Sequence, residues 1–329
     1  MHKKRIVVVG GGTGTHTVLS GLRKYSETID IRAIVSMADS GGSTGRLRDE
    51  FGHLPSGDVR NALTALAGEG DGEDTLLRQL FMYRFDRGTG LAGHNFGNLF
   101  LTALTDILGS EVKAILAASR LLAVSGCVIP VTTENVHLIA SYADGTQIQG
   151  EHEIELYKGA STITNLTLTK DATLFKDARA ALKEADLIVL GPGDLYTSVI
   201  ANCIVRGFKE ALQASNARIV YVCNLMSRPG QTDGFGTRDY SREITRYTGI
   251  VPDYLLVNNA TLPKGLLKRY AKVATYPVLN TGADSSETKV LALNLLASEA
   301  VKTSKGDVLT RSLIRHDPHI LATILLDVL

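Results

Sequence analysis

The hydrophobic positions of this chain fall in short continuous runs separated by polar segments. Each run is rich in β-branched residues and ends at glycine or a polar residue, a pattern typical of strands buried on both faces. The predicted strands cover residues 5–10, 31–37, 187–191, 218–225 and 254–259. Amphipathic segments of helical length cover 15–25, 58–67, 74–85, 95–108, 111–120, 174–185, 198–215 and 237–248. This alternation predicts βαβ units and a mostly parallel sheet.

Segment 132–157 departs from this alternation. The run HLIASYA leads into the turn sequence DGTQ, and a polar-alternating run follows. An Asp-Gly turn between two such runs predicts an antiparallel hairpin, which we place as an insertion near the middle of the chain. A last helix opens at Pro318. The chain therefore predicts a Rossmann-like three-layer α/β fold over residues 1–329, taken as one domain with an inserted β-hairpin or small subdomain.

The balance of charged and apolar residues narrows the class of protein. The chain has 329 residues, of which 44% are hydrophobic and 21% are charged, and its formal net charge is +1. This neutrality argues against a nucleic-acid-binding surface. No apolar stretch reaches the roughly 18 residues that a membrane span needs, and the apolar run near the first residue is too short for a signal peptide. We expect a soluble, cytoplasmic protein without nucleic-acid or membrane partners.

A glycine-rich turn joins the first predicted strand to the first predicted helix. It contains Gly10, Gly11, Gly12 and Gly14, with Thr13 between them. Bare backbone lets a phosphate approach closely, and the start of a helix adds unpaired N–H groups and the positive end of the helix dipole. The spacing matches neither the dinucleotide pattern GxGxxG nor a P-loop, which needs a lysine. The turn therefore predicts a phosphate or pyrophosphate site, and NAD stays an alternative ligand.

A second glycine-rich stretch, ADSGGSTGRLR, follows the second predicted strand. Asp39 stands at the strand tip, where a carboxylate binds a ribose hydroxyl or a metal ion such as Mg²⁺. The neighbouring Gly41, Gly42, Ser43 and Arg46 suit a phosphate or pyrophosphate. Because ligands of such sheets bind outside the carboxyl ends of the strands, we expect both glycine-rich stretches to contribute to a single site.

Further polar residues gather at other predicted helix starts and strand ends. In LPSGDVRNAL, Asp58 fits either a ligand contact or a helix N-cap. Asn98 lies one turn into a very apolar helix and needs a hydrogen-bond partner, from a ligand or from the backbone. The stretch LGPGDLYTSV follows a strand and precedes a helix, which makes it a second potential anion site. The other candidate ligand residues of these stretches, and of the loop after the next strand, are Arg60, Asn61, His94, Gly191, Pro192, Gly193 and Asn224.

The sequence RHDPHI near the end of the chain places His316 and His319 three residues apart. Two histidines and Asp317 could bind a metal ion, but the following proline marks a helix start. We expect these side chains to be solvated at that helix start.

Taken together and in order, seven motifs resemble the CofD/YvcK family. They are GGGTG, ADSGGSTGRLR, LPSGDVRNAL, GHNFGNL, GPGDLYTS, CNLMSRPGQTDG and the terminal RHDP. They run from residue 10 to about residue 318, and GGGTG, GGSTGRLR and GPGDLYTSV look more like the YvcK branch. Family members commonly carry ADDGG in the second stretch, whereas this chain has Asp39 followed by Ser40. If that second aspartate is a metal ligand in the transferases, this chain lacks it.

The resemblance to the YvcK branch implies a regulatory protein, linked to gluconeogenesis and cell shape, that binds a nucleotide sugar of the UDP-N-acetylglucosamine type. In that case the amides of Gly11–Gly14 and Gly191–Gly193 face the pyrophosphate, Arg46 neutralises its charge, and Asp39 takes a ribose hydroxyl or a metal-bound water. The residues that orient the sugar or the base are then His94, Asn98 and Asn224.

The resemblance to the CofD branch implies instead a Mg²⁺-dependent phospholactyl transferase. Such an enzyme moves a phospholactyl group from a nucleotide-activated donor to a deazaflavin acceptor. Asp39 and Asp58 would be its catalytic residues, with Asp39 as a ligand of Mg²⁺. An NAD-binding protein is a second alternative. The resemblance is also compatible with a homodimer, although no residue pattern marks an interface.

Overall fold

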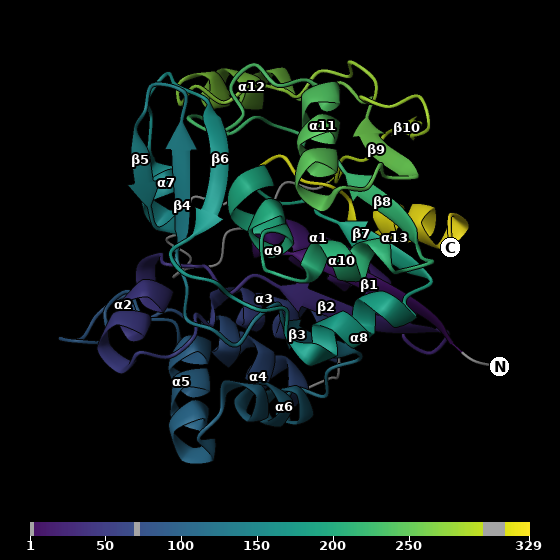
Figure 1. The fold of residues 1–329 in the computed structure, drawn as a ribbon. Helices are drawn as coiled ribbons and strands as arrows, with labels where there is room; N and C mark the ends of the chain where they lie inside the picture. The colour runs from purple at the N-terminus through teal and green to yellow at the C-terminus, as the bar shows by residue number, and fades with distance from the viewer. Residues whose placement is uncertain (1–2, 69–72, 299–312) are drawn as a thin grey trace.

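A parallel sheet runs through the middle of the molecule (Figure 1), whose computed structural model describes residues 3–68, 73–298 and 313–329. Within these residues seven strands pair in the order β10-β9-β8-β7-β1-β2-β3, and every neighbouring pair is parallel. The strands are β1 (Lys4–Gly10), β2 (Ile29–Val35), β3 (Cys127–Pro130), β7 (Leu187–Leu190), β8 (Arg218–Val222), β9 (Tyr254–Asn258) and β10 (Lys289–Leu293). The five predicted strands are confirmed, and the sequence analysis missed β3 and β10 at the two edges.

The order of the strands places a switch point beside β1. The chain first moves from β1 to β2 and β3, and then returns to the other side of β1 with β7, β8, β9 and β10. At such a point the loops after two neighbouring strands diverge and leave a crevice at the carboxyl ends of the strands, where ligands of this fold class bind. Here those loops follow Gly10 and Leu190.

Helices cover both faces of the sheet (Figure 1). On one face α1 (Gly12–Arg23) packs against α3 (Gly57–Leu66) and α13 (Pro318–Asp327). An outer group of α4 (Glu73–Met82), α5 (Phe96–Leu108) and α6 (Glu111–Leu121) packs on α3, and α2 (Gly42–Phe51) contacts α5. The other face carries α8 (Lys176–Glu184), α10 (Phe208–Gln213) and α11 (Thr237–Thr248). This arrangement gives the predicted three-layer α/β fold.

Three predicted segments differ from the observed elements. Helix α1 begins at Gly12, three residues earlier than predicted, so Thr13 and Gly14 lie in its first turn. The stretch treated as a second loop folds from Gly42 into α2, since its arginines and leucine outweigh its glycines. The predicted helix 198–215 is wrong in extent, because the positive φ of Gly207 (94°) interrupts the helical path. The segment consists instead of a π-helical turn, η1 (Leu195–Ile200), the short α9 (Ala201–Cys203), and α10.

A small antiparallel sheet is inserted between β3 and α8, and Figure 1 shows it beside the main sheet. Its strands β4 (Leu138–Tyr142) and β5 (Gln147–Gln149) form the predicted hairpin, and β6 (Ile163–Leu168) pairs with the other side of β4. The end of the predicted hairpin segment forms a helix instead, α7 (Glu151–Leu156), whose first-turn glutamates favour a helix N-terminus. The assignment of residues 1–329 to one domain stays a prediction.

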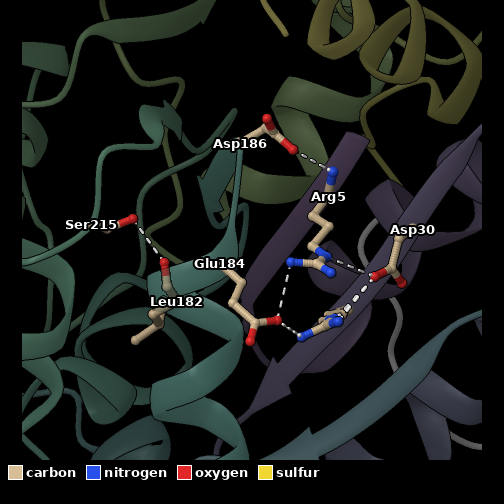
Figure 2. A network of polar contacts seen from close by, with 7 residues as sticks. Arg5, Asp30, Leu182, Glu184, Asp186 and Ser215 are labelled. Atoms are coloured by element: carbon tan, nitrogen blue, oxygen red, sulfur yellow. Dashed lines mark hydrogen bonds and ion pairs between the residues drawn. The ribbon is translucent and has the colours of Figure 1, made fainter. Parts of the chain in front are cut away.

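A ring of charged side chains joins the sheet to α8 on the side of the amino ends of β1 and β2 (Figure 2). Arg5 lies 3.2 Å from Glu184 and 3.5 Å from Asp30, and Arg32 lies 3.2 Å and 3.1 Å from the same two carboxylates. The backbone N–H of Arg5 also donates to Asp186 at 2.9 Å. The ring therefore ties β1, β2 and α8 together at a distance from the switch point. None of the helices within the described ranges combines the length and apolar character that crossing a membrane requires.

Candidate functional site

A cavity of about 560 Å³ lies at the carboxyl ends of β1, β7 and β8. Its volume falls within the range of small-molecule sites. Three more segments complete its wall: α7 of the inserted sheet, the stretch 270–275 around the end of α12 (Lys264–Ala271), and residues 314–316 before α13. The lining residues that carry the argument below are Gly11, Gly12, Thr13, Gly14, Asp39, Asp58, Glu151, Glu155, Gly193, Asp194, Asn224, Leu225, Arg228, Tyr270, Arg315 and His316.

The floor of the cavity is the turn between β1 and α1. Gly12 has a φ of +64°, a conformation that favours glycine. A side chain at Gly14 would meet the carbonyl of Pro192, so glycine is what lets the first turn of α1 approach the loop after β7. The N-cap of α1, Gly11, has no side chain to cap the helix. The helix start therefore presents its positive dipole end and its first N–H groups toward the cavity, as an anion site requires.

The loops after β7 and β8 are fixed to this floor by side-chain amides. Asn224 donates to the carbonyl of Gly193 at 2.8 Å, which links the β8 loop to the β7 loop. Asn202, from α9, donates to the carbonyl of Gly10 at 3.3 Å. The peptide bond between Gly191 and Pro192 is cis. Backbone from three strand ends is thus held side by side around one space.

Partly buried carboxylates form one side of the cavity. Asp58 accepts a hydrogen bond from the N–H of Gly12 at 2.7 Å, so it braces the glycine turn rather than capping α3. Burial and the charge of Asp39 raise the pKa of Asp58 to about 7. Burial also raises the pKa of Asp39, against the opposing effects of hydrogen bonds from Gly41 and Thr44. Two neighbouring acids whose ionised forms are disfavoured in this way form a site that favours a proton or a cation.

Helix α7 adds two more carboxylates, which the sequence analysis did not identify. Burial raises the pKa of Glu151 well above its usual value, and the charges of Asp39 and Glu155 add to this effect. Burial and the charge of Asp194 raise the pKa of Glu155 to about 7. Glu151 and Glu155 are four residues apart, a spacing that places both on one face of a helix. That spacing was the available sequence signal.

Ser40 attaches α7 to the second glycine-rich stretch. Its hydroxyl accepts from the N–H of His152 at 3.0 Å, and its own N–H donates to Glu151 at 3.4 Å. The serine that replaces the family's usual second aspartate therefore contacts the helix that supplies two of the acidic residues.

Arg228, in the loop after β8, is a guanidinium at the cavity wall. It lies 2.9 Å from Glu155 and 3.5 Å from Asp194. The charge of Asp194 raises the pKa of Arg228, with Glu155 adding to the effect. Among the described residues, five carboxylates and two guanidiniums line the cavity, the second guanidinium being that of Arg315. Arg228 is therefore the cation placed to exchange carboxylate partners for the phosphates of a ligand.

The other end of the cavity is apolar. Leu225, Leu262 and Ile314 form a small hydrophobic cluster, separate from the main core, with Tyr270 packed against it. The hydroxyl of Tyr270 accepts from the N–H of Leu313 at 2.7 Å, which joins α12 to the segment before α13. This end suits a flat apolar or aromatic group.

The two histidines of RHDPHI have different environments. His319 is exposed, and its Nε2 lies 2.7 Å from Nζ of Lys24. The expectation of a solvated His316 is wrong: this side chain is only 7% exposed and lines the cavity. The reason is that residues 314–316 run along the apolar end of the cavity before α13 begins.

The carboxylates of Asp39 and Asp58 at the switch point are the residues predicted to hold magnesium. Among the described residues no group of three or more His, Cys, Asp or Glu side chains could hold a metal ion. Magnesium, however, is often held by one or two carboxylates together with phosphate oxygens and water. Asp39 and Asp58 offer carboxylate oxygen atoms. The charge of Asp39 also disfavours ionisation of Asp58, and a bound cation would relieve this repulsion. They fit a magnesium ion that arrives with a phosphate ligand, and Asp39 as its ligand stays a prediction.

The structure brings about half of the predicted ligand residues together. Those that line the cavity are Gly11, Gly12, Thr13, Gly14, Asp39, Asp58, Pro192, Gly193 and Asn224. Those outside its lining are Gly10, Gly41, Gly42, Ser43, Arg46, Arg60, Asn61, His94, Asn98 and Gly191. Their direct contact with a ligand stays a prediction.

Several residues of the second group hold the surrounding loops in place. The hydroxyl of Ser43 lies 3.2 Å from Nδ1 of His94, and Arg46 donates to the carbonyl of Ala92 at 3.1 Å. Asn98 donates to the hydroxyl of Thr44 at 3.1 Å. These bonds link the start of α2 to the start of α5 and the loop before it.

Comparison with known proteins places this arrangement among related chains. The sequence model of the family described as "2-phospho-L-lactate transferase CofD" matches residues 6–300. The gluconeogenesis factor of Bacillus subtilis is 37% identical over 329 residues, covering 99% of this chain and 98% of that protein. The gluconeogenesis factor of Halalkalibacterium halodurans is 40% identical over 311 residues, covering 94% of this chain and 93% of that protein. A crystal structure from Bacillus halodurans, described as a member of the UPF0052 family, matches with a TM-score of 0.88 and 35% identity, over 99% of each chain.

Proposed function

The chain belongs to the CofD/YvcK family, and from this premise we propose that it is a cytoplasmic regulatory protein of carbon metabolism that binds a nucleotide sugar of the UDP-N-acetylglucosamine type. The relatives named gluconeogenesis factor support the metabolic role. A link to cell shape belongs to the same proposal. The observation that supports this ligand is the order of chemical surfaces along the cavity at the carboxyl ends of the strands.

The strand order β8-β7-β1-β2 places the glycine turn after β1 between Asp39, which follows β2, and Leu225 of the apolar cluster, which follows β8. A nucleotide sugar has the same order of groups: a hydroxyl-rich sugar, a diphosphate and a heterocycle. The backbone amides of α1 and Arg228 suit the diphosphate. Asp39 and Glu151 suit sugar hydroxyls, which donate to carboxylates, and Tyr270 suits the heterocycle. A simple phosphate ester would leave most of this lining without contacts.

Binding of ligand fragments tests this order. We expect UDP-N-acetylglucosamine to bind more tightly than UDP, and UDP more tightly than pyrophosphate, in isothermal titration with Mg²⁺ present. In thermal unfolding, ligand at one hundred times its Kd stabilises by about 2.7 kcal/mol, and GDP and NAD serve as competing candidates. Equal affinity for UDP-N-acetylglucosamine and pyrophosphate would remove the nucleotide-sugar proposal.

A variant on α7 tests the sugar end by itself. Glu151→Gln removes a carboxylate that accepts from hydroxyls but also reduces repulsion of the diphosphate. We therefore expect the preference for UDP-N-acetylglucosamine over UDP, the Kd of UDP divided by that of UDP-N-acetylglucosamine, to fall by about tenfold. This corresponds to the loss of one charged hydrogen bond to the sugar. Glu27→Gln, at an exposed position away from the cavity, is the matched control. An unchanged ratio places the sugar elsewhere.

A Mg²⁺-dependent phospholactyl transferase is the second candidate, favoured by the pairing of Asp39 with Asp58 next to the glycine turn. These two carboxylates would hold the metal ion, which would neutralise phosphate charge during transfer. The test is transfer from a nucleotide-activated phospholactyl donor to a deazaflavin acceptor, with and without Mg²⁺. Turnover that Asp39→Ala abolishes supports the enzyme. Turnover that Asp39→Ala leaves intact removes the metal assignment, whereas nucleotide-sugar binding without turnover supports the regulatory protein.

A further inference from the structure

We propose that His316 accepts a hydrogen bond from an N–H or O–H donor on the nucleoside half of the ligand and thereby determines which nucleosides bind. The proposal rests on the proposed nucleotide-sugar function and assigns a residue to its specificity. The donor is either the ring N–H of a uracil-type base or a ribose hydroxyl, and the experiment below distinguishes the two.

The first observation is an unpaired buried nitrogen. His316 lines the cavity beside Ile314 and Arg315, and 93% of the residue is buried. Its Nε2 is inaccessible to solvent and has no hydrogen-bond partner among the described residues. A buried polar atom without a partner has lost its hydrogen bonds to water without replacement, which destabilises the structure. A ligand donor that reaches this atom recovers that energy.

The second observation fixes which ring nitrogen carries the proton. A backbone hydrogen bond with Cys223 raises the pKa of His316. A bond with this effect stabilises the protonated ring, so the backbone carbonyl accepts from a ring N–H. Because Nε2 is unpartnered, the donor is Nδ1. Burial lowers the pKa of His316 to about 4, so at neutral pH the ring is uncharged and Nε2 presents a lone pair.

The chemistry of this lone pair excludes part of the ligand as its partner. A neutral imidazole nitrogen that only accepts cannot bond to a phosphate oxygen, which also only accepts. The side chains around the same end of the cavity are Leu225, Ile314 and Tyr270, which suit a heterocycle rather than a diphosphate. The nucleoside half therefore supplies the donor. A site built around one hydrogen-bonding group strongly rejects analogues that lack it.

Isothermal titration of the full chain with defined nucleotides tests the proposal. The probes are UDP, CDP, 2′-deoxy-UDP, 3′-deoxy-UDP and pyrophosphate. CDP lacks the ring N–H of uracil, and each deoxy compound lacks one hydroxyl. If the base is the donor, the wild-type protein binds CDP at least tenfold more weakly than UDP and binds the deoxy compounds as it binds UDP. If a ribose hydroxyl is the donor, the matching deoxy compound is the weak one.

Two substitutions connect the discrimination to this residue. His316→Phe keeps a ring but removes the acceptor, so we expect UDP affinity to fall at least tenfold and the preference among nucleotides to disappear, while pyrophosphate affinity stays unchanged. His316→Gln supplies an amide oxygen and restores part of the affinity and the preference. His319→Phe, an exposed histidine one turn away, is the matched control and leaves all probes unchanged.

The results of these titrations either support or overturn the assignment of His316. Unchanged UDP affinity in His316→Phe overturns the proposal, as does an equal loss for UDP and pyrophosphate. If His316→Phe fails to fold, the wild-type series still decides, because equal binding of UDP, CDP and both deoxy compounds leaves no donor for His316. Failure of the wild-type protein to bind UDP at all refutes the proposed function itself. Tight UDP binding that ignores His316 refutes only this assignment.

Discussion

Replacing Asp58 by asparagine is expected to stabilise the unliganded protein at alkaline pH. In the fold this carboxyl is largely withdrawn from solvent and lies close enough to Asp39 to feel its charge, and its pKa is raised from 3.8 to about 7. That change corresponds to about 4 kcal/mol of disfavoured ionisation, because each pKa unit is worth about 1.4 kcal/mol. Asparagine resembles the protonated carboxyl in shape and still accepts from the N–H of Gly12. The variant should therefore escape most of this penalty.

The sign of the pH dependence follows from the two states. In the unfolded chain the carboxyl ionises near pH 4, whereas in the folded protein it keeps its proton up to about pH 7. The contribution of the protonated form to stability is complete below pH 4 and is lost as the pH rises to about 7. Relative to wild type, Asp58→Asn should gain about 4 kcal/mol at pH 8 but only about 1 kcal/mol at pH 4.5.

Urea unfolding at these two pH values, in a buffer with a chelator, measures the difference. The chelator matters because a bound cation would neutralise the acidic pair and hide the effect. Asp171→Asn, at an exposed position, is the control and should change stability by less than about 0.5 kcal/mol. A gain that is equal at both pH values, or a loss at pH 8, would refute the reasoning that burial and the charge of Asp39 disfavour ionisation of Asp58.

Three further substitutions test other parts of the structure. Gly14→Ala forces a methyl group against the carbonyl of Pro192, so urea unfolding should show a loss of about 1–3 kcal/mol and titration should show weaker pyrophosphate binding; unchanged values would mean the two loops need not approach. Glu184→Gln opens the charged ring of Figure 2. Because that carboxylate is 44% exposed, the free energy of unfolding should fall by less than about 1 kcal/mol, and the loss should shrink at high salt. A loss of stability that salt does not reduce would contradict this. Arg228→Gln should weaken pyrophosphate binding about tenfold. Arg46→Gln, outside the cavity lining, should weaken it less. The reverse order would support the sequence-based prediction that Arg46 contacts the phosphate.

The architecture followed from the sequence because strands buried on both faces have an unambiguous pattern. β1 is hydrophobic from Ile6 to Val9, and β7 is hydrophobic over its whole length. β10 escaped prediction because it lies at the sheet edge and its ends are exposed, which dilutes the apolar signal. Helix α2 escaped because Gly42 and Gly45 argue locally against a helix, and the helix-favouring arginines and leucine, together with packing against α5, override that preference.

The part of the cavity lining that consists of glycine backbone could be predicted from the sequence. Gly11, Gly12 and Gly14 line the cavity, as their position at the junction of a strand and a helix predicts, and their binding of a phosphate stays a prediction. Side chains that reach the cavity from distant segments were not predictable. Glu155 enters from an inserted sheet, and His316 from near the end of the chain. The spacing of Glu151 and Glu155 indicates that both lie on one helix face, but it does not indicate that this face meets the loop after β1, and no spacing places His316 there.

Helix α12 has consequences for how the cavity exchanges its contents. None of its residues is fully buried, and its apolar side chains rest on the separate cluster around Leu225 and Ile314. Regional opening costs only the contacts that are broken, so this end can detach without disturbing the central strands. Under the proposed function, the nucleoside of the ligand then arrives and departs by that route while the glycine turns keep their shape. Amide hydrogens of residues 264–271 should accordingly exchange with deuterium faster than those of β1, and saturating ligand should slow them selectively.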